Sequence, residues 1–379
     1  MKKLYKNLPA IIFACFIVAM LVLFLVLPKK EYSSSEKRYL QQAPAFTFSR
    51  LLSGDFGKDF EKYLSDQTAG RNFWVGLSSY YNYAIGNNGS NGIYLCKDGY
   101  LVNDPEDMSG LDRNIGFIEE FAEKTSVKPV VLIAPSTGYV CEDILPAVHR
   151  EYTDDAEFED MKAALPSVDF VDIRELFKST YDNGANQIYY KTDHHWTAKG
   201  AYTAYSALAQ PLGFTAKPES DYKVTEYPDF YGTTYSSSGF WMTAPDTVEV
   251  WDSHANDEKS PVTVTITDGD EVIEQGGMFF YDHLEEDDKY PIYLDGNHPY
   301  TVIKNFAASS DEKLLVVKDS FAHSLVPFLA DHFSEIIMVD LRYYTSSVSA
   351  LIESEGIDRV LVLYSIDNLA TDTNLGWLQ

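Results

Sequence analysis

Residues 190–198 read YKTDHHWTA and place an acid, two histidines and a tryptophan side by side. Asp193 and His195 are two residues apart, so the carboxylate can fold back onto the imidazole. It would then fix the tautomer through Nδ1 and leave Nε2 free to take a proton from a nucleophile. A polar stretch before a helix also suits a capping Asp193 and a structural His195. Catalysis therefore requires a third residue from elsewhere in the chain.

Ser320 is the candidate nucleophile. In LLVVKDSFAHSLVPFL, residues 314–329, it follows an apolar run and begins a predicted helix. The hydroxyl would lie at the edge of a sheet, with the N–H groups of Ser320 and Phe321 aimed at an oxyanion. Serine is also a favoured helix N-cap, and the glycine pattern of a nucleophile elbow is absent. Both interpretations stay open on this stretch alone.

Metal binding is the rival chemistry for the DHH run. Asp-His-His could ligate zinc, and DHH also marks a class of manganese-dependent phosphoesterases. Those enzymes need further Asp motifs in register, and we find no such set in this chain. The remaining histidines show no H-x-x-x-H or H-E-x-x-H spacing. We therefore predict no metal and no cofactor.

An α/β domain must position these residues. Apolar runs typical of buried strands alternate with predicted helices, which indicates a mostly parallel sheet covered by helices on both faces. Between about residues 214 and 312 the pattern changes to alternating Tyr, Thr and Val with glycine turns and acidic loops, which predicts a β-rich insertion. The predicted strands lie within 128–136, 167–176, 312–321, 334–342 and 358–368.

Small polar residues follow three of these strands. Ligands in open α/β sheets bind at the carboxyl ends of the strands. Ser136 follows the first strand, Ser320 the third, and Asn368 the last. We expect Ser136, and Tyr139 just after it, to line a cleft at this edge.

The first thirty residues differ from the rest. Three lysines precede an apolar run from Leu8 to Leu27, long enough for one membrane crossing, which needs ~20 residues. No A-x-A cleavage pattern follows, so we predict an uncleaved signal anchor over residues 1–30, with the body outside the cytoplasm. Residues 31–54 then form a polar stalk and residues 55–379 the ectodomain.

Composition narrows the possible partners. The 379 residues carry a formal net charge of -27, which argues against nucleic acid and against an anionic membrane surface as partners. A hydrophobic fraction of 45% argues against disorder. Of the three cysteines, Cys15 lies in the anchor. Cys96 and Cys141 could pair in an oxidising compartment, although a domain of this size does not need a disulfide.

Several stretches together carry a family resemblance. TDHHWTAKGAY at 192–202, FYGTTYSSSG at 230–239, the Ser320 stretch and VLVLYSIDNL at 360–369 resemble the DHHW family. That family is similar to the periplasmic alginate O-acetyltransferases, which belong to the SGNH-hydrolase-like superfamily. The likeness runs from about residue 55 to the end of the chain.

The resemblance implies a role for each matching residue. Asp193 would orient His195, His195 would act as the general base, and Ser320 would be the nucleophile. Asn368, just past the last strand, is our choice for an oxyanion-hole side chain. Lys318 and Asp319 depart from the small or glycine-rich turn expected before the serine, so an inactive relative stays an alternative.

Four further residues are candidate substrate contacts. They are Trp196, His194, Ser136 and Tyr139. Packing behind the histidines is the other interpretation of Trp196, and His194 could face away from Ser320.

These features predict a membrane-anchored, extracytoplasmic serine enzyme. It would move acyl groups onto or off a cell-surface polysaccharide, with acetyl as the favoured group and transfer favoured over hydrolysis. The resemblance also implies a multi-pass membrane acyltransferase as the acyl supplier. The alternative is a catalytically inactive module that binds glycan or scaffolds a polysaccharide-modification complex.

Overall fold

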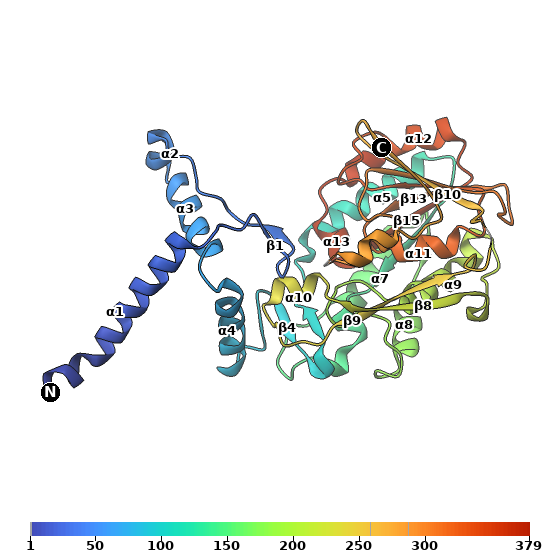
Figure 1. The fold of residues 1–379 in the computed structure, drawn as a ribbon. Coiled ribbons are helices and arrows are strands. Elements are labelled where there is room, and N and C mark those ends of the chain that lie inside the picture. Colours follow the sequence, from blue (N-terminus) through green and yellow to red (C-terminus); the bar gives the residue numbers. More distant parts are fainter. Residues whose placement is uncertain (1, 258, 287) are drawn as a thin grey trace.

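The computed structural model describes residues 2–257, 259–286 and 288–379 (Figure 1). An α/β body forms most of the chain, and helix α1 (Lys2–Val26) extends away from it at the N-terminus (Figure 1). The C-terminus lies on the body, beside the end of α12 (Figure 1).

The body is built on a mixed eight-stranded sheet. Its strand order is β11-β10-β12-β14-β13-β15-β6-β7. The five strands from β14 to β7 run parallel, whereas β12, β10 and β11 pair antiparallel. Their bounds are β6 Pro129–Ala134, β7 Asp169–Val171, β10 Val262–Asp268, β11 Glu271–Gly276, β12 Tyr300–Asn305, β13 Lys313–Lys318, β14 Glu335–Val339 and β15 Arg359–Ser365.

The α/β class predicted from the sequence is confirmed, but the sheet is mixed and not simply parallel. The predicted β-rich segment supplies the antiparallel part, because β12 pairs with the outer edge of β14. That pairing covers an edge that would otherwise expose a row of backbone donors and acceptors. In the same segment, β8 (Lys223–Phe230) and β9 (Asp246–Asp252) form a separate two-stranded ribbon.

Helices cover both faces of the sheet (Figure 1). Side chains alternate along each strand, as in β13, where Leu314 and Val316 face one core and Leu315 and Val317 the other. Helices α8, α9 and α11 pack on the first face, and α5, α7, α12 and α13 pack on the second. Their bounds are α5 Leu111–Lys124, α7 Asp154–Ala164, α8 Arg174–Tyr181, α9 Ala198–Leu212, α11 Ala322–Leu329, α12 Val348–Glu355 and α13 Ile366–Thr371.

Short elements connect α1 to the body (Figure 1). Arg38 pairs with Asp66 at 2.7 Å and with Glu36 at 2.8 Å, and Arg71 pairs with Glu36 at 2.7 Å. These ion pairs join the strand pair β1–β2 to α3 and α4. The bounds are β1 Tyr32–Ser33, β2 Arg38–Tyr39, α2 Phe48–Ser53, α3 Asp55–Asp66, α4 Arg71–Ala84, β3 Gly89–Ser90, β4 Ile93–Leu95 and β5 Leu101–Asn103.

Three neighbouring parallel strands end at one edge of the sheet. The order β13-β15-β6 brings the turns after Lys318, Ser365 and Ala134 together. Helices α11, α13 and the short α6 (Thr137–Val140) begin there. Ser320, Asn368 and Ser136 therefore gather at the edge where the rule for open sheets places a ligand.

Candidate active site

Asp193, His195 and Ser320 form one hydrogen-bonded chain. His195 Nε2 lies 2.7 Å from Ser320 Oγ, although the two residues are 125 positions apart. His195 Nδ1 contacts Asp193 Oδ1, which also accepts the His195 backbone N–H at 3.0 Å. Because a carboxylate only accepts, Nδ1 carries the ring proton and Nε2 accepts from the Ser320 hydroxyl. All three side chains are buried.

The DHHW stretch forms a tight loop that runs into α9. A bridge between Tyr189 and Trp196 closes the loop, and the Tyr190 N–H donates to His195 O at 3.1 Å. Thr197 then caps α9, its hydroxyl accepting from the Gly200 N–H. Thr197, and not Asp193, therefore caps α9. The Asp193 carboxylate is available to bind His195.

The segment at 230–239 holds Asp193 from the other side. Asp193 Oδ2 accepts from the Thr233 N–H at 2.7 Å and from its hydroxyl at 3.0 Å. These donors lie at the start of α10 (Thr233–Ser238). Burial, the largest single effect, would raise the pKa of Asp193, but His195 and His194 beside it together outweigh burial and hold that pKa well below its ordinary value. Asp193 is therefore a carboxylate with both oxygens engaged.

Tyr290 covers one face of His195. The two rings stack with centroids 3.9 Å apart and an interplanar angle of 9°. The Tyr290 hydroxyl donates to Ser320 O at 3.1 Å and lies 3.3 Å from Ser324 Oγ. This tyrosine belongs to the one-turn helix Tyr290–Ile292 in the β-rich segment, so that segment contributes directly to the site. No motif surrounds Tyr290, so the sequence alone does not mark it as a site residue.

The turn before Ser320 is organised by Asp319. Its Oδ1 accepts from the Phe321 N–H at 2.9 Å, and its Oδ2 accepts from the Ser365 N–H and the Asn368 side-chain N–H, both at 2.8 Å. The Phe321 N–H predicted for the oxyanion hole is thus already occupied, and that part of the prediction is wrong. Among the residues that the structure describes, nothing accepts from the Ser320 N–H. The Ser320 N–H and the second Asn368 N–H are the donors left for an oxyanion.

Lys318, the other departure from the expected turn, points into the core. Its ammonium donates to Asp340 Oδ2 at 2.9 Å and lies 2.8 Å from His323 Nε2. Asp340 also pairs with Arg342. Lys318 and Asp319 therefore have structural partners, and neither side chain occupies the place of a substrate.

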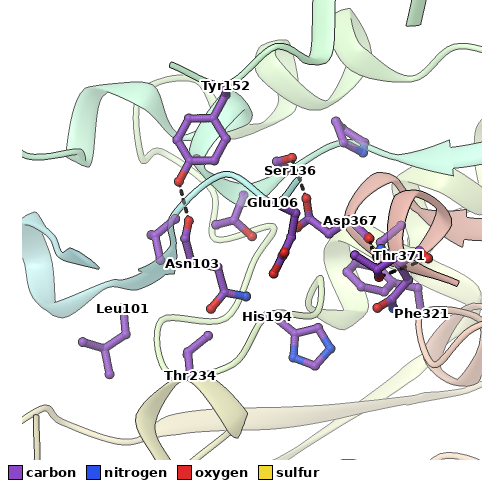
Figure 2. Close-up of a pocket in the computed structure, with 16 residues that line it drawn as sticks. Leu101, Asn103, Glu106, Ser136, Tyr152, His194, Thr234, Phe321, Asp367 and Thr371 are labelled. Atoms are coloured by element: carbon purple, nitrogen blue, oxygen red, sulfur yellow. Dashed lines mark hydrogen bonds between the residues drawn. The ribbon is translucent and has the colours of Figure 1, made fainter. Parts of the chain in front are cut away.

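Two of the four predicted substrate contacts line a cavity beside the Ser320–His195 pair. The cavity has a volume of about 240 Å³ and is lined by Ser136 and His194, with Phe321 and Asn368 (Figure 2). His194 Nδ1 lies 2.5 Å from Thr233 Oγ1. Burial lowers the pKa of His194 to about 3, so its ring is neutral near pH 7.

The other two predicted contacts are core residues. Trp196 is completely buried, and its indole N–H donates to Phe321 O at 3.1 Å and to Ser324 Oγ at 2.9 Å. Tyr139 is buried in α6, and its hydroxyl donates to Asp155. Neither lines the cavity. Trp196 packs against α11 behind the serine, as the packing interpretation of that residue expects.

The DHH run also brings three potential metal ligands together. Asp193, His194 and His195 each offer an atom within 4.8 Å of the others. In this arrangement Asp193 is saturated by donors, His195 bridges to Ser320, and His194 Nδ1 meets the Thr233 hydroxyl. A metal ion would have to break these contacts, so the donor set fits a proton-transfer chain better than a metal centre.

Comparison with known proteins finds a family match over part of the chain. Residues 163–339 match the DHHW protein family. The matched segment contains Asp193, His195, Tyr290 and Ser320, whereas Ser136 and Asn368 lie outside it. The resemblance predicted from the sequence is therefore confirmed.

A curated relative and two solved structures extend the DHHW match. Over 191 residues the chain is 26% identical to the probable alginate O-acetylase AlgJ of Pseudomonas aeruginosa. The aligned part covers 46% of each protein, so this chain spans about half the length of that relative. A DHHW family protein from Eubacterium siraeum matches with a TM-score of 0.64 and 23% identity, over 76% of this chain and 95% of that one. PatB1 of Bacillus cereus, solved with a sulfonyl adduct, matches with a TM-score of 0.63 and 25% identity, over 74% and 96%.

Proposed function

We propose that this protein is a membrane-anchored, extracytoplasmic serine acyltransferase that acetylates a cell-surface polysaccharide through a covalent intermediate on Ser320. The observation that carries the proposal is the 2.7 Å contact between His195 Nε2 and Ser320 Oγ, with Asp193 on the opposite ring nitrogen. AlgJ is named as a probable alginate O-acetylase, which supports acetyl as the group and polysaccharide as the acceptor.

The first half-reaction forms the acyl-enzyme. His195 Nε2 takes the hydroxyl proton while Ser320 Oγ attacks the carbonyl carbon of an acyl ester. The Ser320 N–H and the Asn368 side chain stabilise the oxyanion of the tetrahedral intermediate. As the intermediate collapses, the donor's carbon–oxygen bond breaks and His195 returns the proton to the departing alcohol. Asp193 keeps the imidazole in the required tautomer and stabilises its protonated form.

The second half-reaction repeats these steps with an acceptor hydroxyl. His195 takes the proton of a sugar hydroxyl, whose oxygen attacks the acyl carbonyl and releases Ser320. Water in the same place would give hydrolysis. Transfer is favoured where water is excluded, and here Tyr290 covers one face of His195, and Ser320 is only 7% exposed. We therefore place acetyl transfer ahead of esterase activity.

The architecture we propose follows the sequence predictions. Residues 1–30 anchor the chain in the cell membrane, residues 31–54 form a stalk, and residues 55–379 form an SGNH-hydrolase-like ectodomain whose insertion spans about 214–312. The apolar stretch Asn7–Val26, with a mean hydropathy of 3.0, supports the anchor by its length and composition. A multi-pass acyltransferase in the same membrane is the proposed acyl donor.

Covalent labelling tests this proposal directly. Purified full-length protein in detergent is treated with phenylmethylsulfonyl fluoride, and the modified residue is located by mass spectrometry of peptides. We expect one adduct, on Ser320, together with loss of p-nitrophenyl acetate turnover. Ser320→Ala should remove both, whereas the exposed Ser179→Ala should change neither. An unlabelled wild-type protein, or turnover that survives Ser320→Ala, would exclude catalysis through Ser320 and favour the scaffold alternative.

A further inference from the structure

The cavity beside Ser320 is the feature that the proposed reaction leaves without an occupant. It lies where the chain leaves β6 and β15, with α10 and β5 closing its other sides (Figure 2). His194, Phe321 and Asn368 form the wall nearest the Asp193–His195–Ser320 chain. A molecule in this cavity would therefore lie next to the acyl group on Ser320.

The polar groups of the wall suit hydroxyl groups. Ser136, Thr137, Thr234 and Thr371 contribute hydroxyls, and Asn103 contributes an amide. Ser136 also donates through its hydroxyl to Asp367 Oδ1 at 3.4 Å. Such groups can both donate to and accept from the hydroxyls of a sugar ring.

The charges of the wall all have one sign. Glu106 and Asp367 line the cavity, and Figure 2 shows both side chains beside its open centre. Among the described residues that line it, none is Lys or Arg. His194, the one basic side chain there, is neutral near pH 7 because burial lowers its pKa to about 3. A carboxylate entering the cavity would therefore meet the Glu106 carboxylate and, above about pH 7, an ionised Asp367, with no cation to compensate them.

A third carboxyl group reinforces this charge from behind. Asp154 is buried and accepts the Ser136 N–H at 2.7 Å. Burial, followed by the charges of Asp154 and Glu106, raises the pKa of Asp367 to about 7. Asp367 already resists ionisation next to these two groups, and a substrate carboxylate would add to the same repulsion.

We propose that this cavity is the acceptor subsite and that it selects uncharged sugars over uronates. The inference rests on the proposed acetyl transfer, and it specifies the acceptor of that reaction. Hydroxyl and amide groups recognise the sugar, while Glu106 and Asp367 exclude acceptors that carry a carboxylate, which is selection by an unfavourable interaction. Alginate, the polymer in the name of AlgJ, is a polyuronate. The acceptor of this chain therefore differs in charge class from the polymer for which that relative is named.

Binding to a catalytically silent variant tests the inference without requiring turnover. Full-length Ser320→Ala protein in detergent is titrated by calorimetry with four trisaccharides: glucose, N-acetylglucosamine, glucosamine and mannuronate trimers. We expect at least one uncharged trimer to bind at least tenfold more tightly than the mannuronate trimer at pH 8, where Asp367 is mostly ionised. Equal or tighter binding of the mannuronate trimer overturns the inference. Tightest binding of the cationic glucosamine trimer, or no binding of either uncharged trimer, overturns it as well.

A charge reversal then tests whether the wall of this cavity causes the preference for uncharged sugars. Glu106→Lys in the same background should reduce the preference against mannuronate at least threefold, because it places a cation in the wall. Glu123→Lys is the matched control, since Glu123 is exposed on α5 and outside the cavity. An unchanged preference in Glu106→Lys overturns the assignment to this cavity. Labelling of Ser320 by the sulfonyl reagent is independent of these titrations, so failure of the subsite and failure of the proposed function remain distinguishable.

Discussion

His195 makes one contact from each ring nitrogen, and the two contacts assign its tautomer. Asp193 accepts from Nδ1–H, so Nε2 accepts from Ser320. In Asp193→Asn the amide can donate to Nδ1 and move the ring proton to Nε2, where it blocks proton transfer. We expect kcat for p-nitrophenyl acetate to fall by about 10⁴-fold, the loss seen when this acid is replaced by asparagine in a serine protease.

The melting temperature (Tm) of this variant separates chemistry from folding. Asp112→Asn, on the exposed side of α5, is the matched control and should retain full turnover. A loss below tenfold in Asp193→Asn, with Tm unchanged, would show that Asp193 does not set the tautomer.

Asp367 gives the site a predicted dependence on pH. Burial, with Asp154 and Glu106 nearby, raises its pKa from 3.8 to about 7. Between these values the unfolded chain has released a proton that the folded chain keeps, so the free energy of unfolding decreases as pH rises and levels off above pH 7. Asp367→Asn removes this contribution. We expect the Tm of wild type relative to the variant to fall by about 2–4 °C between pH 5 and pH 8.

The measurement that tests this prediction is the difference in Tm between wild type and Asp367→Asn at each pH. Asp154, whose pKa burial raises to about 6, is present in both and contributes to both curves. A Tm difference that stays constant with pH would show that Asp367 ionises in the folded protein as it does in solution.

The predictions about Asp193, His195 and Ser320 rest on local features of the sequence. The i, i+2 spacing of Asp193 and His195 is a local property, and so is the place of Ser320 between a strand and a helix. Tyr290 stacks on His195 through tertiary packing and has no local motif to mark it. The Phe321 N–H was assigned wrongly because its capture by Asp319 depends on side-chain geometry.

The starts of helices hold the site together, and the start of α10 leaves no room for a side chain at Gly232. A Cβ added to Gly232 would lie 2.1 Å from Asp193 Cβ and 2.3 Å from its Oδ2, well inside van der Waals contact. Gly232→Ala must therefore displace Asp193 or α10. We expect turnover to fall at least 100-fold and the free energy of unfolding to decrease by about 1–3 kcal/mol, as for other overpacked sites.

Gly116→Ala is the matched control for Gly232→Ala. Gly116 is exposed within α5, and a Cβ there meets nothing within 4 Å. Alanine in a helix is favoured over glycine by about 0.5–1 kcal/mol, so this variant should be as active as wild type and slightly more stable in urea unfolding. Full activity in Gly232→Ala would mean that α10 can move without disturbing Asp193.

The positions of the strands along the chain were easier to predict than the pairing of one strand with another. The five parallel strands lie within predicted strand segments, and burial on both faces gives β6, β13, β14 and β15 a continuous apolar signal. Alternation of apolar and polar residues can indicate a strand, but it cannot show that β12 pairs with β14. For the same reason, the sequence indicated a β-rich segment without showing that it extends the main sheet and delivers Tyr290 to the site.

At the scale of the whole molecule, an acidic α/β body is joined to one apolar helix. The span Asn7–Val26 is not buried against the rest of the chain, and its mean hydropathy is 3.0. Within the described residues, Phe16 of α1 makes a ring contact with Trp74 of α4, and Phe24 makes one with Tyr63 of α3. The strand pairings of the main sheet and the hydrogen bonds of the candidate site lie within the α/β body. We therefore predict that membrane anchoring and catalysis are separable.

Removal of the helix tests that separation. We expect the full chain to stay in the membrane pellet after alkaline carbonate extraction, and a chain beginning at Tyr32 to be soluble. The two should have Tm values within about 2 °C, since the deleted span buries no core surface, and both should be labelled by the sulfonyl reagent on Ser320. A mature protein that lacks residues 1–30 in cells would instead identify them as a cleaved signal sequence. Loss of Ser320 labelling in the shortened chain would show that α1 supports the site, because the acidic body alone would then fail to hold His195 against the serine.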